Sequence, residues 1–206
     1  ESGCGKSTLG LSILRLLPPP GHITTGRALY DNTDLVKADE ITLRKVRGRE
    51  ISMVFQDPSA TLNPLMRIRD HFLEFYAAHE PGLSRSDAVS KARDLLMQLG
   101  IPSERLEDYP HQLSGGMKQR VCIGLAIALT PRILIADEPT TALDVTIKAQ
   151  ILDLLKELRT RFNLAILLIT HDLGVVAEVC DTVLVMYGGI TAEYANVDTL
   201  YNDPRH

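Results

Sequence analysis

The chain has 206 residues, of which 45% are apolar, and a formal net charge of −4 with both signs interspersed along the sequence. This length allows one domain with a full hydrophobic core, and the charge pattern lacks the basic stretches typical of a nucleic-acid-binding surface. The three cysteines, Cys4, Cys122 and Cys180, are far apart and lack metal-ligand spacing, which favours a reducing compartment over a disulfide framework or a zinc site.

The first eight residues read ESGCGKST, which lacks only the first glycine of the phosphate-binding pattern GxxxxGK[ST]. Glycines let successive backbone N–H groups point at phosphate oxygens, Lys6 can reach the β- and γ-phosphates, and the Ser7 hydroxyl can ligate Mg²⁺. The expected phosphate-binding residues are Gly3, Cys4, Gly5, Lys6, Ser7 and Thr8. A helix from Lys6 to Leu17 follows, and the prolines at 18–20 are expected to end it.

Short apolar runs alternate with longer helical patterns in the rest of the chain, which is typical of a largely parallel sheet flanked by helices. The predicted strands are Ile51–Phe55, Ile133–Ala136, Leu164–Ile169 and Thr182–Met186, and the predicted helices are Arg67–His79, Ser86–Leu99 and Gly115–Leu129. Gly26–Asn32 reads as a strand and turn of a smaller antiparallel sheet, and Tyr187–Ile190 as a late hairpin turn. We predict an α/β core formed by residues 1–56 and 131–206, with an inserted α-helical subdomain at 57–130.

Three of the predicted strands end at polar side chains: Gln56, Asp137 and the pair Thr170-His171. Ligands bind outside the carboxyl ends of strands in open parallel sheets, so these side chains are expected at one edge. Asp137 is followed at once by Glu138, and neighbouring side chains at a strand end point to opposite faces. The two acids can therefore take different tasks, with Asp137 on a metal ion and Glu138 toward an attacking water.

Ser114-Gly115-Gly116 opens the helix predicted at 115–129, with Ser114 as its N-cap and glycines that permit close backbone approach. The order of the motifs along nearly the whole chain resembles that of the ATP-binding-cassette ATPases. The motifs are the phosphate loop, Gln56, Ser114-Gly115-Gly116, the two acids, Ala142-Leu143-Asp144 and Thr170-His171. Taken alone, Gln56 is an ordinary strand-end amide and Asp144 a helix-capping residue. The combination is what carries the resemblance.

Longer stretches are similar to one branch of that family, the bacterial oligopeptide, dipeptide and nickel importers. They are ISMVFQDP with LNP at 51–58 and 62–64, YPHQLSGGM at 109–117, and DEPTTALDVT at 137–146. The resemblance implies a P-loop NTPase fold and an ATPase subunit that powers a peptide-type importer. It leaves the transported substrate open, because separate proteins select it.

The resemblance also implies roles for individual residues. Lys6 and the backbone of 3–8 would hold the phosphates of ATP, Ser7 and Asp137 would ligate Mg²⁺, and Gln56 would contact the metal or water and sense a membrane partner. Glu138 would polarise the hydrolytic water and His171 would bridge to the γ-phosphate. Ser114, Gly115, Gly116 and Asp144 would face an ATP bound to a second cassette.

Two departures from the family pattern stand out. Met117 occupies a signature position that is Gln in many cassettes, which we interpret as a subtype with a second, non-identical ATPase as partner. The strand and the adenine-stacking aromatic that precede the phosphate loop in the family are not in this sequence. We therefore expect an N-terminally truncated piece that by itself binds Mg-ATP poorly and does not hydrolyse it.

The expected partners are the second ATPase, transmembrane permease subunits and, indirectly, an extracytoplasmic substrate-binding protein, with no nucleic acid. The resemblance implies a location at the cytoplasmic face of the bacterial inner membrane, as a peripheral protein. The longest apolar stretch, Val121–Leu129, is too short to cross a bilayer, so another subunit would hold the protein there. Two alternatives remain: an inert truncated cassette, and a non-transport cassette ATPase. The latter carry long coiled-coil or zinc-binding insertions, for which this chain has neither heptads nor cysteine clusters.

Overall fold

The computed structural model describes residues 3–205, which form two compact units. Unit 1 contains the residues up to Arg47 and those from Leu168 onward, and unit 2 contains Gly48–Leu167. The helical segment predicted as a subdomain, 57–130, lies within unit 2 together with neighbouring strands. The division into a core and an inserted subdomain at those boundaries stays a prediction.

Three strands form the central sheet in the order β3 (Ile51–Val54), β4 (Ile133–Asp137) and β5 (Ala165–Ile169). Strands β3 and β4 run parallel, with Val54 opposite Ala136. All four residues of β3 and the last four of β4 are buried, as expected for continuous apolar strands covered on both faces. Because the two strands are in register, residues two positions beyond each paired end, 56 and 138, leave the sheet side by side.

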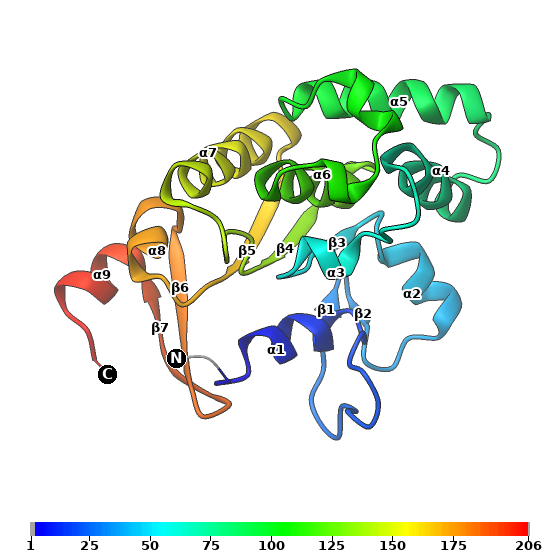
Figure 1. Ribbon diagram of the computed structural model, residues 1–206. Coiled ribbons are helices and arrows are strands. Elements are labelled where there is room, and N and C mark those ends of the chain that lie inside the picture. The colour runs from blue at the N-terminus through cyan, green and yellow to red at the C-terminus, as the bar shows by residue number, and fades with distance from the viewer. Residues whose placement is uncertain (1–2, 206) are drawn as a thin grey trace. The chain divides into compact units, whose positions relative to one another are not determined.

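The helices of unit 2 pack around one buried helix, α6 (Gly115–Ile127), which contacts β3 (Figure 1). Its helical neighbours are α3 (Pro58–Thr61), α4 (Ile68–His79), α5 (Arg85–Gln98) and α7 (Val145–Phe162). Short 3₁₀ turns at Ser103–Glu107 and Pro110–Gln112 lead from α5 to α6. A Cβ on Gly124 of α6 would lie 2.8 Å from Leu99 Cδ1, so this glycine permits the close approach of α5 to α6.

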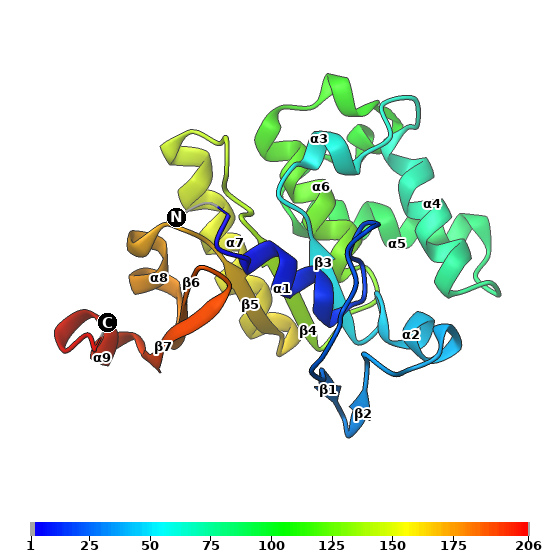
Figure 2. The same cartoon turned by 90° about the horizontal axis from the view of Figure 1, so that it is seen from below.

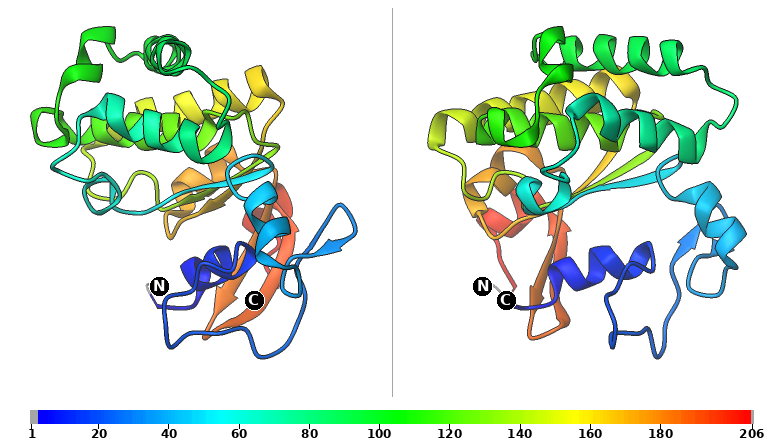
Figure 3. Two further views of the ribbon diagram at one scale, coloured as in Figure 1. Left: turned by 90° about the vertical axis from the view of Figure 1, so that its right-hand side faces the viewer. Right: turned by 45° about the vertical axis from the view of Figure 1, so that its right-hand side comes forward.

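Unit 1 contains two antiparallel hairpins and short helices. Strands β1 (Leu29–Tyr30) and β2 (Thr33–Asp34) turn through Asp31 and Asn32, both at positive φ, and the hairpin projects beside α2 (Glu40–Val46) in Figure 2. The longer hairpin, visible in Figure 3, joins β6 (Thr182–Tyr187) to β7 (Ile190–Asn196). Both predicted hairpin features are confirmed. The remaining helices are α1 (Lys6–Ile13), α8 (Leu173–Val179) and α9 (Val197–Asn202).

The α/β class with a parallel sheet flanked by helices is confirmed, and two predicted helices are shorter than expected by at least two residues, α6 by two and α1 by four. Helix α1 ends at Ile13 rather than Leu17, because Arg15 adopts a left-handed conformation (φ 51°) and the Leu16 N–H turns back to the carbonyl of Leu11. The prolines at 18–20 therefore follow the end of the helix and do not cause it. Within residues 3–205, no helix is both long and apolar enough to span a bilayer.

Candidate functional site

The phosphate-loop residues from Gly3 onward lie in unit 1, while Glu1 and Ser2 fall outside the described residues. Gly3 and Gly5 have φ of 86° and 96°, values that side-chain-bearing residues rarely adopt. Gly5 is the N-cap of α1 and has no side chain that could bond to the first-turn N–H groups. The loop thus has the glycine-dependent conformation and the bare helix N-terminus that suit a phosphate.

Cys4 and Lys6 interact within this loop. The Lys6 Nζ donates a hydrogen bond to Cys4 Sγ at 3.2 Å, and this bond lowers the pKa of the thiol. The Cys4 carbonyl accepts a hydrogen bond from the backbone N–H of Gly189, in the β6–β7 turn. The Lys6 ammonium group is therefore held against the side chain of Cys4 in the same loop.

Gln56 and Glu138, 82 residues apart in the chain, meet at the carboxyl ends of β3 and β4. The Gln56 Nε2 donates to Glu138 Oε2 at 3.1 Å, and the strand register is what brings the two positions close. Asp137, the last residue of β4, is only 5% exposed, whereas Glu138 is half-buried. Glu138 also has a φ of 44°, a conformation that costs free energy in a residue other than glycine and is found most often at functional sites.

A second side-chain donor to Glu138, a hydroxyl group, was not identified from the sequence. Thr141 Oγ1 donates to Glu138 Oε2 at 2.8 Å, and the Thr141 N–H bonds to the carbonyl of Glu138 in the same turn. The sequence contains the threonine three positions after the carboxylate, but nothing in it distinguishes Thr141 from the adjacent Thr140. The distinction depends on the backbone conformation of the turn.

Ser114, Gly115 and Gly116 form the N-terminus of α6, as predicted. The Ser114 hydroxyl accepts from the Met117 N–H at 3.3 Å. A Cβ on Gly116 would lie 2.6 Å from Ile147 Cγ2 of α7, and one on Gly115 would lie 3.4 Å from Leu143 Cδ2. Gly116 is buried and its lack of a side chain is thus explained by helix packing, whereas Ser114 and Gly115 are exposed.

Asp144 lies beside this helix terminus and caps α7, because its Oδ1 accepts from the Ile147 N–H at 2.9 Å. The structure thus brings Asp144 near Ser114–Gly116 through their shared neighbour Ile147. His171 belongs to unit 1 and is exposed in the loop between β5 and α8. Asp172, which follows it, caps α8 through the Val175 N–H.

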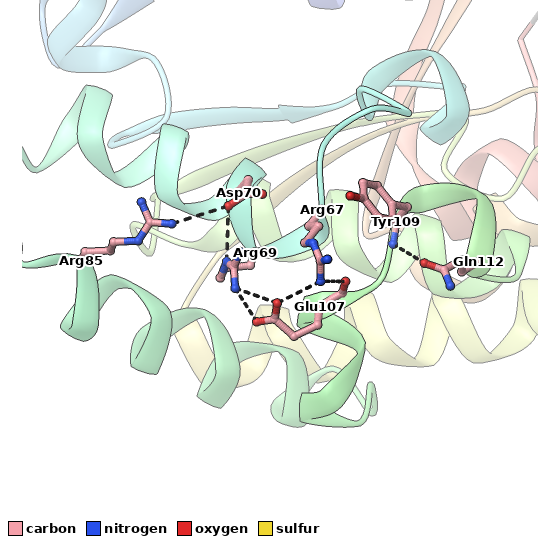
Figure 4. Close-up of polar contacts among 7 residues, drawn as sticks. All are labelled: Arg67, Arg69, Asp70, Arg85, Glu107, Tyr109 and Gln112. Carbon is pink, nitrogen blue, oxygen red and sulfur yellow. Dashed lines mark hydrogen bonds and ion pairs between the residues drawn. The ribbon is translucent and has the colours of Figure 1, made fainter.

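An ion-pair network ties the start of α4 to the segment that precedes Ser114 (Figure 4). Glu107 accepts from Arg69 Nη1 at 2.6 Å and from Arg67 Nη1 at 3.3 Å. The Arg67 guanidinium also lies over the ring of Tyr109, 5.3 Å from its centroid, and the Ile68 N–H bonds to the carbonyl of Asp108. The segment after Gln56 and the segment before Ser114 are therefore held together by both side chains and backbone.

The sequence model of the family described as ABC transporter matches residues 1–141. Over its full length the chain is 49% identical to the oligopeptide transport ATP-binding protein OppD of Bacillus subtilis (strain 168), covering 58% of that protein. It is 48% identical to the dipeptide transport ATP-binding protein DppD of the same organism, covering 62%, and 46% identical to DppD of Escherichia coli (strain K12), covering 63%. The chain thus spans about three fifths of the length of these curated relatives.

Two solved structures share the fold. The ATP-binding cassette MJ0796, in a dimeric post-hydrolysis state bound to ADP and Pi, matches 96% of this chain and 82% of its own, with 29% identity and a TM-score of 0.82. The cbiO1 protein of Clostridium perfringens, part of the ABC transporter complex cbiONQ, matches 98% of this chain and 77% of its own, with 30% identity and a TM-score of 0.79. A glycine-dependent phosphate loop, an acidic pair at the end of a buried strand and these matches lead to one conclusion: the chain belongs to the ABC transporter family.

Proposed function

We propose that this chain is the ATP-hydrolysing part of a subunit that powers a peptide-type ABC importer. The observation that carries the proposal is Glu138, a carboxylate directly after the buried Asp137, fixed by hydrogen bonds at the end of β4. The names of the relatives, which are oligopeptide and dipeptide transport ATP-binding proteins, support the choice of substrate class. Nickel transport remains a second candidate within the same branch.

The residues present fit Mg-ATP. Gly3–Thr8 provide backbone N–H groups and the Lys6 ammonium for phosphate, which suits an anion at the N-terminus of α1. Ser7, Asp137 and Gln56 provide a hydroxyl, a carboxylate and an amide oxygen, the hard ligands that Mg²⁺ prefers. Gln56 donates to Glu138 through its Nε2, so its oxygen is the atom suited to the metal. When bound, the metal would neutralise phosphate charge.

Catalysis in this proposal rests on positioning and electrostatics. Glu138 accepts a proton from, or polarises, the water that attacks the γ-phosphate, and His171 bonds to that phosphate group. Its exposed position at the end of β5 leaves the His171 ring accessible to a ligand. Lys6 stabilises the negative charge that moves to the leaving oxygen.

A second cassette completes the proposed active unit. Ser114 and Gly115 are exposed at the N-terminus of α6 and Asp144 is exposed beside them, so this surface suits an ATP bound to another subunit. Gly116 contributes by allowing α6 to approach α7. The dimeric state of the related MJ0796 cassette supports this arrangement.

The second cassette is proposed to be a different protein, because Met117 replaces the glutamine found in many signatures. Permease subunits would hold both ATPases at the cytoplasmic face of the membrane, with a substrate-binding protein acting on the other side. Co-purification with the permeases is expected to yield two distinct ATPases in equal amounts. A complex that contains two copies of this subunit and no other ATPase contradicts this part of the proposal.

The main test replaces Glu138 by Gln in the full-length protein. The substitution keeps the shape of the side chain and removes its charge, so ATP affinity is expected to stay nearly unchanged while turnover falls on the order of 10²-fold or more. Phosphate release under steady-state conditions and equilibrium binding of Mg-ATP measure the two quantities. Nucleotide-dependent dimers should accumulate in the variant and can be followed by size-exclusion chromatography.

Equal turnover in the wild-type and E138Q proteins contradicts the assignment of Glu138. An exposed carboxylate on α7, Glu157, serves as the control, since Glu157→Gln makes the same chemical change away from the site. E157Q is expected to hydrolyse ATP at the wild-type rate.

A further inference from the structure

Glu138 Oε2 accepts two side-chain hydrogen bonds that come from different elements. Gln56 Nε2 reaches it from the end of β3 at 3.1 Å, and Thr141 Oγ1 reaches it from the turn after β4 at 2.8 Å. An ionised carboxylate can only accept, so the Thr141 hydroxyl is the donor in its bond. A hydrogen bond from a hydroxyl to a charged oxygen belongs to the stronger class of such bonds.

We propose that Thr141 is a positioning residue for Glu138, whose hydroxyl holds the carboxylate in the orientation needed to polarise the attacking water. This inference rests on the proposed function, because it concerns how Glu138 performs its role. Thr141 acts through Glu138 and does not itself contact the water. Its effect is on the geometry of the carboxylate, which must be maintained closely for catalysis.

The backbone of the turn fixes the distance between the two residues. The Thr141 N–H bonds to the carbonyl of Glu138 at 3.1 Å, and left-handed conformations at Glu138 (φ 44°) and Ala142 (φ 62°) enclose the turn. The hydroxyl is therefore brought to Oε2 by local structure. Threonine is β-branched, with restricted rotation about χ1, which further limits where the hydroxyl can lie.

The two residues that donate to Glu138 differ in their other proposed roles. Gln56 is the residue proposed to ligate Mg²⁺ and to respond to the membrane partner, and it follows β3, whereas Glu138 follows β4. Thr141 shares one short turn with Glu138, so its bond can persist when the Gln56 amide changes partner. The hydrogen bond from Thr141 to the Glu138 carboxylate is therefore expected to persist, while the bond from Gln56 changes.

The test compares Thr141→Val, which keeps the shape and removes the donor, with Thr141→Ser, which keeps the donor, in the full-length protein. T141V is expected to lower kcat on the order of 10- to 100-fold, the range seen when a partner that orients a metal ligand is removed, with KM for ATP within about twofold of wild type. T141S is expected to recover most of kcat. Thr160→Val is the matched control, since Thr160 is exposed and its hydroxyl bonds only to the helix carbonyl of Lys156.

A double variant separates positioning from a structural role. In the E138Q background the Thr141→Val change is expected to cost no further activity, because residues that act as a unit are non-additive. Wild-type kcat in T141V, or T141S as slow as T141V, overturns the inference. So does a rise in KM with unchanged kcat. If T141V fails to fold, as judged by circular dichroism, Thr141→Ala replaces it.

The outcomes also separate this inference from the proposed function. If E138Q hydrolyses ATP like the wild type, the assignment of Glu138 fails whatever Thr141 does. If E138Q is slow and T141V is normal, only the inference about Thr141 is wrong.

Discussion

At the residue scale, Gly115 and Gly116 at the start of α6 differ in the space that a side chain would have. A Cβ at position 116 would lie 2.6 Å from Ile147 Cγ2, closer than real Cβ contacts, whereas one at 115 would lie at an acceptable 3.4 Å from Leu143. Packing therefore accounts for Gly116, and Gly115 remains free to serve a ligand. The two positions can be separated by experiment.

Gly116→Ala is expected to destabilise the protein by about 1–3 kcal/mol, because the added methyl group overpacks the contact between α6 and α7. Gly115→Ala is the matched control and should leave the free energy of unfolding nearly unchanged. Urea denaturation measures both. Ile147→Ala removes the atom that would clash. The double variant should therefore lose less free energy of unfolding than the sum of the losses in the two single variants, and strict additivity of the losses contradicts the packing explanation.

The residue types of the site were predictable, but several of their contacts were not. A phosphate-loop pattern and an acidic pair after an apolar strand single out Lys6 and Glu138 as candidates, because the proposed chemistry depends on residue type and local spacing. The bond from Thr141 to Glu138 and the contact of Gly116 with Ile147 depend on backbone conformation and helix packing, which no spacing in the sequence encodes.

At the element scale, helix α7 has a clear helical pattern in the sequence, although no helix is predicted there. Ile151, Leu154, Leu155 and Leu158 are buried at helical spacing, Asp144 is the N-cap, and Asn163 ends the helix in a left-handed conformation. The helices α4, α5 and α6 were predicted from the same kind of periodicity. The short α2, α8 and α9 were not predicted, because six or seven residues carry little periodic signal.

The C-terminal end of α4 provides a titratable contact. The His79 ring packs on Phe75 with centroids 4.7 Å apart, and its atoms lie 3.1 Å from where a Cβ on Gly48 would be. Burial lowers the pKa of His79, with a further contribution from the charge of Arg49. Arg49 also donates to the backbone carbonyl of His79, so the two residues are held together.

The free energy of unfolding is expected to fall as the pH is lowered through the unfolded-state pKa of histidine, about 6.5. The folded state takes up a proton at His79 only below that pH, so the unfolded state binds more protons in this window and is favoured. His79→Gln should reduce the loss of stability between pH 7 and pH 5.5, measured by urea denaturation. His22→Gln, which removes an exposed histidine, is the control; equal pH slopes in the wild type and H79Q rule out the explanation.

At the scale of the whole molecule, the main hydrophobic core belongs to unit 2. Its members run from Val54 to Leu164 and include the fully buried Phe72, Ile123 and Leu134. Unit 1 has fewer buried apolar side chains, and its β6–β7 hairpin is a two-stranded sheet with Tyr194 69% exposed. Two-stranded sheets are marginally stable without further packing.

Hydrogen exchange of the full 206-residue chain is expected to follow this division. Amides of β3, β4 and α6 should exchange slowest, at rates that report global unfolding, while those of β6, β7 and α1 should exchange faster through local opening. Mass spectrometry of peptic peptides resolves these segments. Peptides from 182–196 that are as protected as those from 133–137 would contradict the expectation.

If Glu138 has the catalytic role proposed above, its left-handed conformation lowers stability at the residue on which turnover depends. A glutamate at φ 44° raises the free energy of the folded state by about 1–3 kcal/mol, and asparagine or glycine adopts that conformation more readily. A selection for thermal stability alone would therefore enrich Glu138→Asn and Glu138→Gly while turnover disappears. Retention of glutamate at this position during directed evolution would itself be a sign that hydrolysis, and not only folding, is under selection.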